Sequence, residues 1–311
     1  MNHFANWVYA NFSEHIEKIS EKAYSTVLFS QGFVFKFFGR ESREYDIAAI
    51  TSEYCWDCQM PYLQPILYDD IIINNNHFSL IVMRRIPQTS NVLYKLLCNQ
   101  LSNMEVVEIG HKIWQLASTY QLCNIPANKL YSNYISNINL QLSYLQSFLS
   151  PSIMRDLSET IKNRNIQAFF AIACCNKSAC QIHGNLFSGN IFYHNNDLII
   201  IDPISINHMA RNSLPEMDIA SYLTDIFILL PYEHSDKVIQ LILSPMQEGE
   251  KHIVLLYLLL KILVRIRFAH LELELDHDEY ALRMNTIIVD TKDILLKRVL
   301  ASLSNQLPPA S

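Results

Sequence analysis

The first quarter of the chain alternates short apolar runs with turn-forming residues. Residues 6–19 place apolar side chains at helical spacing, which predicts a short N-terminal helix. The runs 26–29 and 33–38 are rich in β-favouring residues and flank the sequence S-Q-G, so they predict a hairpin. The sequence therefore begins as a helix followed by antiparallel strands.

A helical pattern and two more strand patterns follow. Residues 41–54 carry apolar side chains on one helical face, and the β-favouring runs 64–68 and 78–83 surround the polar sequence N-N-N-H. We therefore expect residues 1–85 to form a small lobe, with an N-terminal helix, an antiparallel sheet and one inserted helix.

Beyond residue 87 the pattern becomes mainly helical. The stretches 106–122, 134–148 and 153–173 have apolar residues at helical spacing, and helices resume near residue 216 and run to about 303. A β-rich island at 181–201 interrupts them, and an N-N-D turn joins its runs 191–193 and 198–201. We expect residues 86–311 to form a larger helical lobe.

The most apolar stretch, 253–264, predicts a buried helix. It is twelve residues long and contains Lys261, whereas a membrane span needs about 20 apolar residues. The first residues, M-N-H-F-A-N-W, lack the basic start and apolar core of a signal peptide. We expect a cytoplasmic protein without a membrane partner.

Composition and charge narrow the function classes. Half of the 311 residues are hydrophobic, enough to bury a sizeable core. A formal net charge of −6 argues against a nucleic-acid partner, because proteins that bind nucleic-acid phosphates usually carry a basic surface. This balance of acidic and basic residues is typical of a soluble enzyme whose acidic patches attract a cationic small molecule.

Seven cysteines do not form a recognisable framework. Their number is odd and they are scattered along a long chain, which argues against paired disulfides. Cys55 with Cys58, and the cluster Cys174, Cys175 and Cys180, could together supply zinc ligands. We favour their interpretation as small hydrophobic residues.

The segment that carries chemistry spans residues 182–203. It reads I-H-G-N-L-F-S-G-N-I-F, then a short turn, then L-I-I-I-D-P. In kinase-like sites one loop orients the attacking hydroxyl and supplies a metal-binding Asn five positions later, and a following strand end supplies a metal-binding Asp. Asn185, Asn190 and Asp202 have this spacing and order.

This segment resembles the aminoglycoside phosphotransferase and fructosamine kinase group of kinase-like enzymes, which carry H-G-D-L-x-x-x-N followed by I-D-P or I-D-W. The resemblance implies an α+β bilobal protein-kinase-like fold, metal binding at Asn190 and Asp202, and ATP or another nucleoside triphosphate with Mg²⁺ as cofactors. It also implies that Asp218, in E-M-D-I-A, braces the loop, and that His183 is structural.

The same resemblance assigns roles to residues that precede this segment in the sequence. A kinase site needs a strand lysine held by a helix carboxylate. Lys36 in F-V-F-K-F-F and Glu44 in R-E-Y fit these roles, with Glu41 and Glu53 as rival partners for the lysine. An edge-strand lysine that prevents aggregation is the alternative for Lys36. The segment 80–87, which includes Met83, resembles the link between lobes that meets the adenine ring. Ser25 and Thr26 end the expected nucleotide-covering loop, which lacks glycine.

Asn185 departs from the family pattern, which has a catalytic Asp there. An amide orients a hydroxyl but cannot accept its proton, and general-base assistance contributes about 10²–10⁴-fold. Three explanations remain open: an introduced replacement of a natural Asp, a natural pseudokinase that acts as a nucleotide- or protein-binding regulatory module, or another chemistry such as AMP transfer. Asn185 and Asp202 are nevertheless the expected catalytic residues.

The sequence gives fewer signals for the acceptor substrate than for the nucleotide. Acidic residues cluster between 271 and 280 and could recognise an amine, although a solvated helix end is the favoured interpretation. The tyrosines at 131, 134 and 144 could line a sugar site, with core packing as the default. The leading hypothesis is an attenuated phosphotransferase that acts on a small-molecule hydroxyl, sugar-like or aminated.

Overall fold

The structure is a computed structural model. It describes residues 3–21, 25–39, 63, 65–117, 119–120, 122–123, 127–163, 166, 168, 170, 179–201, 212–273 and 279–306. The predicted inserted helix at 41–54 lies outside the described residues, as do Cys55, Cys58, Cys174 and Cys175.

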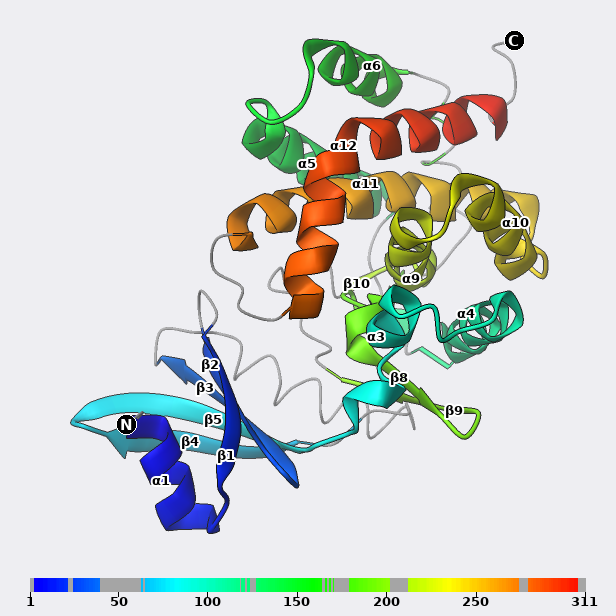
Figure 1. Ribbon diagram of the computed structural model, residues 1–311. Coiled ribbons are helices and arrows are strands. Elements are labelled where there is room, and N and C mark those ends of the chain that lie inside the picture. The colour runs from blue at the N-terminus through cyan, green and yellow to red at the C-terminus, as the bar shows by residue number, and fades with distance from the viewer. Residues whose placement is uncertain are drawn as a thin grey trace.

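A five-stranded antiparallel sheet forms the N-terminal part (Figure 1). Its spatial order is β1-β2-β3-β5-β4, with strands β1 (Ile16–Glu21), β2 (Ser25–Ser30), β3 (Phe33–Gly39), β4 (Ile66–Ile73) and β5 (Asn76–Arg84). The predicted hairpin between β2 and β3 is confirmed. The β4–β5 turn is tighter than expected, because Asn74 and Asn75 both adopt positive φ, at 52° and 65°.

Helix α1 (His3–Phe12) covers one face of the sheet, where its apolar side packs against alternate residues of the strands. The prediction of a helix through residue 19 is wrong. Ser13 adopts φ 57°, which ends the helix, and Ile19 pairs with Leu28 in β1–β2. Sheet pairing therefore overrides a helical pattern that Ile16 and Ile19 happened to continue.

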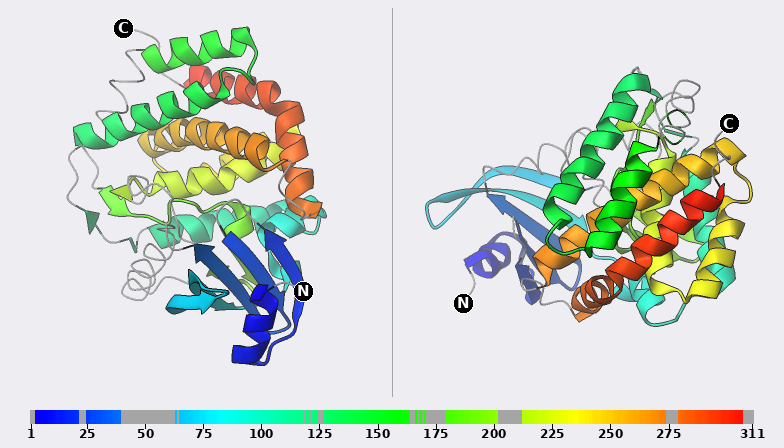
Figure 2. Two further views of the ribbon diagram at one scale, coloured as in Figure 1. Left: turned by 90° about the vertical axis from the view of Figure 1, so that its left-hand side faces the viewer. Right: turned by 90° about the horizontal axis from the view of Figure 1, so that it is seen from above.

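The opposite face of the sheet is called the interlobe face here, and it comprises Lys36, Phe38, Ile81 and Met83. Lys36 lies opposite Ile81 in the β3–β5 register, and both alternate with residues that pack beneath α1. Leu63 packs against this face and donates its backbone N–H to Ile200 at 2.9 Å. Figure 2 shows α1 on the side of the sheet away from the helical part, so the interlobe face is turned toward the helices.

The remainder of the chain is mainly helical. Its helices include α3 (Val92–Leu97), α4 (Asn103–Ala117), α5 (Ala127–Leu145), α6 (Pro151–Lys162), α9 (Glu216–Leu229), α10 (Tyr232–Leu243), α11 (Glu248–Glu272) and α12 (Glu279–Gln306). Helix α9 is buried over residues 216–228 and packs against α4, α10 and α11. Residues 253–263 of α11 are buried as predicted. Among the described helices, none is long and apolar enough to cross a membrane.

Short strands carry the site between these helices. Strand β7 (Ala179–Gln181) leads into it, and β8 (Ile191–His194) and β9 (Asp197–Ile200) form the predicted hairpin. The turn residues Asn195 and Asn196 have φ 51° and 65°, the conformation of a tight hairpin turn. The predicted strand at 181–183 instead spans 179–181, and His183 begins the loop that follows.

Candidate functional site

The segment His183–Asn190, called the site loop here, connects β7 to β8 and is held by α9 at its start. The Asp218 carboxylate is fully buried and accepts the backbone N–H groups of His183 and Gly184 at 2.9 and 2.8 Å. It also accepts the Tyr120 hydroxyl at 2.8 Å. Charge-assisted bonds of this kind are roughly twice as strong as neutral ones, so Asp218 fixes the backbone before Asn185.

The backbone conformation at position 184 favours glycine. Its φ of 79° lies in the left-handed region, which costs other residues about 1–2 kcal/mol. Lys261 of α11 donates from Nζ to the Gly184 carbonyl at 2.6 Å. The turn after β7 is therefore held through both its N–H and its C=O groups.

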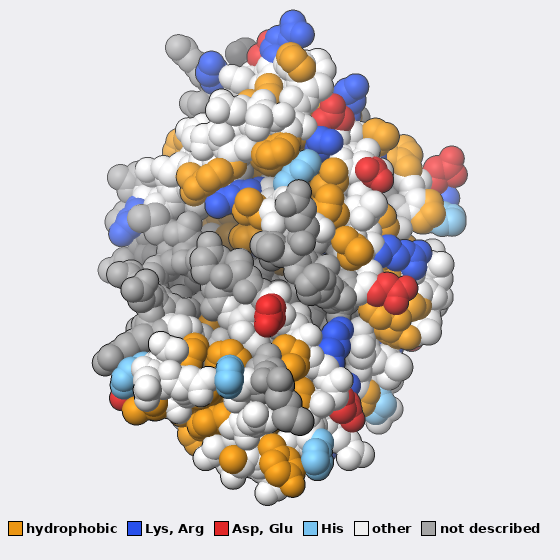
Figure 3. All heavy atoms as spheres, turned by 60° about the vertical axis from the view of Figure 1, so that its left-hand side comes forward, with side chains coloured by type: hydrophobic (Ala, Val, Ile, Leu, Met, Phe, Trp, Pro, Cys, Tyr) orange, Lys and Arg blue, Asp and Glu red, His pale blue; other side chains and the backbone are white. Residues whose placement is uncertain are grey.

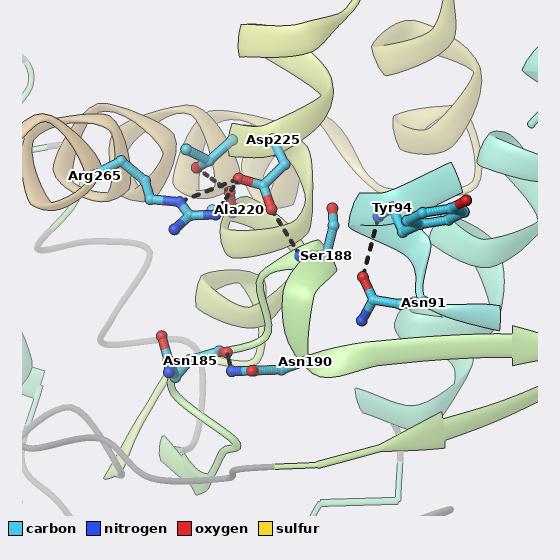
Figure 4. Close-up of polar contacts among 9 residues, drawn as sticks. Asn91, Tyr94, Asn185, Ser188, Asn190, Ala220, Asp225 and Arg265 are labelled. Carbon is cyan, nitrogen blue, oxygen red and sulfur yellow. Dashed lines mark hydrogen bonds and ion pairs between the residues drawn. The ribbon is translucent and has the colours of Figure 1, made fainter. Parts of the chain in front are cut away.

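The second half of the site loop is braced by α9 and α3 (Figure 4). Asp225 accepts the Ser188 N–H at 2.7 Å and pairs with Arg265 of α11 at 2.8 Å. Asn91, the N-cap of α3, accepts the Tyr94 N–H and donates to the Gly189 carbonyl at 2.8 Å. Each brace is a buried or half-buried polar group with a defined partner, which favours one loop conformation.

Asn185 and Asn190 meet within the site loop. The Asn190 side-chain Nδ2 donates to the Asn185 carbonyl at 2.8 Å (Figure 4), which leaves Oδ1 as an acceptor. Ile201 donates its N–H to the Asn190 carbonyl at 3.0 Å. Asp202, the next residue, lies outside the described residues.

The oxygen donors fit a hard divalent ion. Mg²⁺ prefers carboxylate and carbonyl oxygens, and Asn190 presents an amide oxygen that its own Nδ2 bond orients. Among the described residues, no hydrogen bond engages the Asn185 side-chain amide, which is half-buried. That amide can therefore orient a hydroxyl, but it cannot accept the hydroxyl proton as a carboxylate can.

His183 supports the loop from within. Its Nδ1 accepts the Asn185 N–H at 3.2 Å, so Nε2 carries the proton and donates to the Ile201 carbonyl at 3.1 Å. The ring is 2 % exposed. It thus links the start of the loop to the end of β9 and is almost completely buried.

The upstream residues lie on or beside the interlobe face. Lys36 is half-buried on β3, with Nζ 5.1 Å from the centroid of the Phe38 ring, and Met83 is buried on β5. Ser25 and Thr26 begin β2 and pair with Phe38 and Phe37. Glu44 lies outside the described residues. Lys36 is on a central strand, which excludes the edge-strand interpretation.

Sequence reasoning did not identify five residues that help to hold the site loop: Asn91, Tyr120, Asp225, Lys261 and Arg265. One signal was available for Lys261, because a lysine inside a continuous apolar helix needs a buried partner. Asp225 likewise lies seven residues after Asp218 on the same helix, two turns away and on the same face.

Burial lowers the pKa of Lys261 to about 8 from its ordinary 10.5, and the Asp218 charge opposes this shift. The unfolded chain then binds more protons between pH 8 and 10.5, so stability from this group rises with pH in that window. We expect the free energy of unfolding, measured relative to Lys261→Met, to increase by about 3 kcal/mol across it. Chemical denaturation of both proteins at pH 7.5 and 10.5 checks this, and a constant difference would contradict it.

The tyrosines considered for a sugar site lie in different environments. Tyr134 is buried and stacked on Phe170 at 4.6 Å, so it is a core residue, whereas Tyr144 is 49 % exposed beneath Arg267. The acidic residues at 274–278 lie outside the described residues. Over the described residues on the face in Figure 3, acidic and basic side chains are interspersed and form no large patch of one sign.

The fold of the chain is similar to that of several solved structures. A thermostable mutant of aminoglycoside phosphotransferase APH(4)-Ia matches with TM-score 0.59 and 10% identity, covering 96% of this chain and 98% of that one. A choline/ethanolamine kinase family protein from Mesorhizobium loti matches with TM-score 0.57 and 11% identity, covering 96% and 92%. The GDP complex of aminoglycoside 2'-phosphotransferase-IIIa matches with TM-score 0.55 and 13% identity, covering 96% and 98%.

No family model matches the sequence, and no curated protein matches it. The structural matches span nearly the whole chain, so the chain has the bilobal protein-kinase-like fold. The fold implied by the sequence resemblance is confirmed.

Proposed function

We propose that the chain binds a nucleoside triphosphate with Mg²⁺ between the interlobe face and the site loop, and transfers its terminal phosphoryl group slowly to a small-molecule hydroxyl. The observation that carries this proposal is the intact bracing of the loop around Asn185 and Asn190. A loop that only connected two strands would not need two buried carboxylates and two cations to fix its backbone.

Each residue has a role in this proposal. Apolar side chains of the interlobe face, including Met83 and Ile81, would contact the nucleobase, and Lys36 would contact the phosphates with Glu44 as its partner. Ser25 and Thr26 would lie over the phosphates. Asn190 and Asp202 would hold Mg²⁺, which neutralises charge on the transferring phosphoryl group when bound.

Asn185 would orient the acceptor hydroxyl without removing its proton. Positioning and electrostatics supply most of phosphoryl-transfer catalysis, so a small residual rate is expected. The structural matches include aminoglycoside phosphotransferases and a choline/ethanolamine kinase family protein. Aminated and sugar-like alcohols are therefore the first acceptors to test.

The amide at position 185 also supports a second candidate, a pseudokinase that binds nucleotide or a protein partner without turnover. AMP transfer from a reoriented nucleotide is a third chemistry on the same fold. Incubation with γ-³²P-ATP and with α-³²P-ATP separates the three outcomes: terminal phosphate transfer, no transfer, or adenylyl transfer.

Lys36→Met is expected to weaken ATP binding at least about tenfold, equal to 1.4 kcal/mol, because a cation facing the phosphates is lost. Lys18→Met, a lysine on edge strand β1, is the matched control and should leave the affinity unchanged. Isothermal titration calorimetry with ATP·Mg²⁺ and GTP·Mg²⁺ measures both. Equal affinities in the two variants would overturn the assignment of the nucleotide to the interlobe face.

A further inference from the structure

Helix α11 carries two cations, one turn apart, that contact the site loop directly or through Asp225. Lys261 Nζ donates to the Gly184 carbonyl at 2.6 Å, and Arg265 pairs with Asp225, which in turn holds the Ser188 N–H. Both cations also lie over the Phe187 ring, at 5.5 and 4.4 Å from its centroid. The loop is thus attached to α11 as well as to α9.

The burial of Lys261 is costly and is not needed for packing. The residue is 4 % exposed within an apolar segment of α11, where methionine would fill a similar volume without desolvation of a charge. Among the described residues, two charged groups share the contacts of Lys261: Asp218 of α9 holds the Gly184 N–H, and Arg265 of its own helix lies over the same Phe187 ring. Asp225 and His183 bond other groups of the site loop. The Asp218 charge raises the pKa of Lys261 and so opposes the effect of burial.

Lys261 fixes one peptide group of particular importance. The Gly184 carbonyl and the Asn185 N–H belong to the same planar peptide. Lys261 holds its oxygen, and His183 Nδ1 holds its N–H at 3.2 Å. The Gly184–Asn185 peptide is therefore held on both sides. The Asn185 carbonyl in turn accepts a hydrogen bond from the Asn190 side chain.

We propose that Lys261 is a positioning residue: its ammonium locks the Gly184–Asn185 peptide and thereby sets the direction of the Asn190 amide oxygen. This proposal rests on the proposed function for its effect on nucleotide, but the locked peptide is a separate claim. The neutral amine donates a weaker bond than the ammonium. The lock therefore loosens when Lys261 loses its proton, near pH 8.

The test measures ATP·Mg²⁺ affinity at pH 7.0 and 9.0 for the unaltered chain, Lys261→Met and Lys261→Arg. At pH 7.0 we expect Lys261→Met to fold and to bind about 10–100-fold more weakly, as for residues that orient metal ligands. Lys261→Arg should recover part of the loss. The affinity of the unaltered chain should fall at pH 9.0, whereas that of Lys261→Met should stay constant.

Lys251→Met, on the solvent-facing start of α11, is the control and should behave as the unaltered chain. Full affinity in Lys261→Met, or an unaltered chain whose affinity is the same at both pH values, would overturn the proposal. If Lys261→Met does not fold, the pH series on the unaltered chain decides alone.

A nuclear magnetic resonance measurement separates the two claims. The Asn185 amide ¹⁵N shift should titrate near pH 8 in the unaltered chain, with or without nucleotide. If the chain binds no nucleotide but this shift titrates, the proposed function fails and the lock stands. If the chain binds nucleotide and the shift does not move, the lock is overturned.

Discussion

Replacing Asn185 with aspartate is expected to raise phosphoryl-transfer turnover by about 10²–10⁴-fold. The loop is braced on both sides of this position, so the new carboxylate should enter a backbone already fixed by Asp218, Lys261 and Asp225. The described residues place no hydrogen bond on the Asn185 side chain, and the change of amide to carboxylate keeps its shape. The added group can accept the proton that an amide cannot.

The measurement is kcat with ATP·Mg²⁺ across aminoglycoside, choline-like and fructosamine-like acceptors, together with ATP hydrolysis. Asn195→Asp, an exposed turn residue at φ 51°, adds the same charge outside the loop and should leave turnover unchanged. An Asn185→Asp variant that folds and binds nucleotide but gains no turnover on any acceptor would favour the pseudokinase.

Asp218→Ala is expected to have the largest effect on stability, a loss of about 3–5 kcal/mol. It removes the acceptor for three donors, the Tyr120 hydroxyl and the His183 and Gly184 N–H groups. Each buried donor left without a partner costs about 1–3 kcal/mol. The Lys261 ammonium also loses the carboxylate that opposes its desolvation.

Urea denaturation with circular dichroism measures this loss. Asp156→Ala, on the exposed side of α6, is the control and should change stability by less than about 0.5 kcal/mol. Asp218→Asn keeps the volume but places an amide opposite backbone donors, so it should be intermediate. An Asp218→Ala protein as stable as the Asp156→Ala protein would show that the bracing is not energetically important.

Local signals made much of the fold predictable. The hairpin turn at Asn195 and Asn196 uses residues that tolerate positive φ, and the buried part of α11 is a continuous apolar run. The β1 strand was missed because Ile16 and Ile19 satisfy helical spacing too, and only pairing with β2 decides between the two.

The site was predictable where its residues are close in sequence, or where the family resemblance assigned a role, as it did for Asp218. Asn185 and Asn190 lie five apart, which is the spacing of the hydroxyl-orienting residue and the metal-binding Asn in kinase-like sites. Lys261 and Gly184 are 77 residues apart, and Asn91 and Gly189 are 98 apart. Such contacts arise from the packing of α11 and α3 against the loop, which single-sequence periodicity does not encode.

The central claim is that Asn190 helps to hold a divalent ion against a nucleotide, and one titration tests it directly. ATP is titrated into the unaltered chain and into Asn190→Ala, with and without Mg²⁺, at pH 7.0. We predict that Mg²⁺ tightens ATP binding to the unaltered chain at least about tenfold, and that Asn190→Ala folds but loses this gain. ATP affinity that is indifferent to Mg²⁺ in the unaltered chain, or a full Mg²⁺ effect in Asn190→Ala, would contradict the claim.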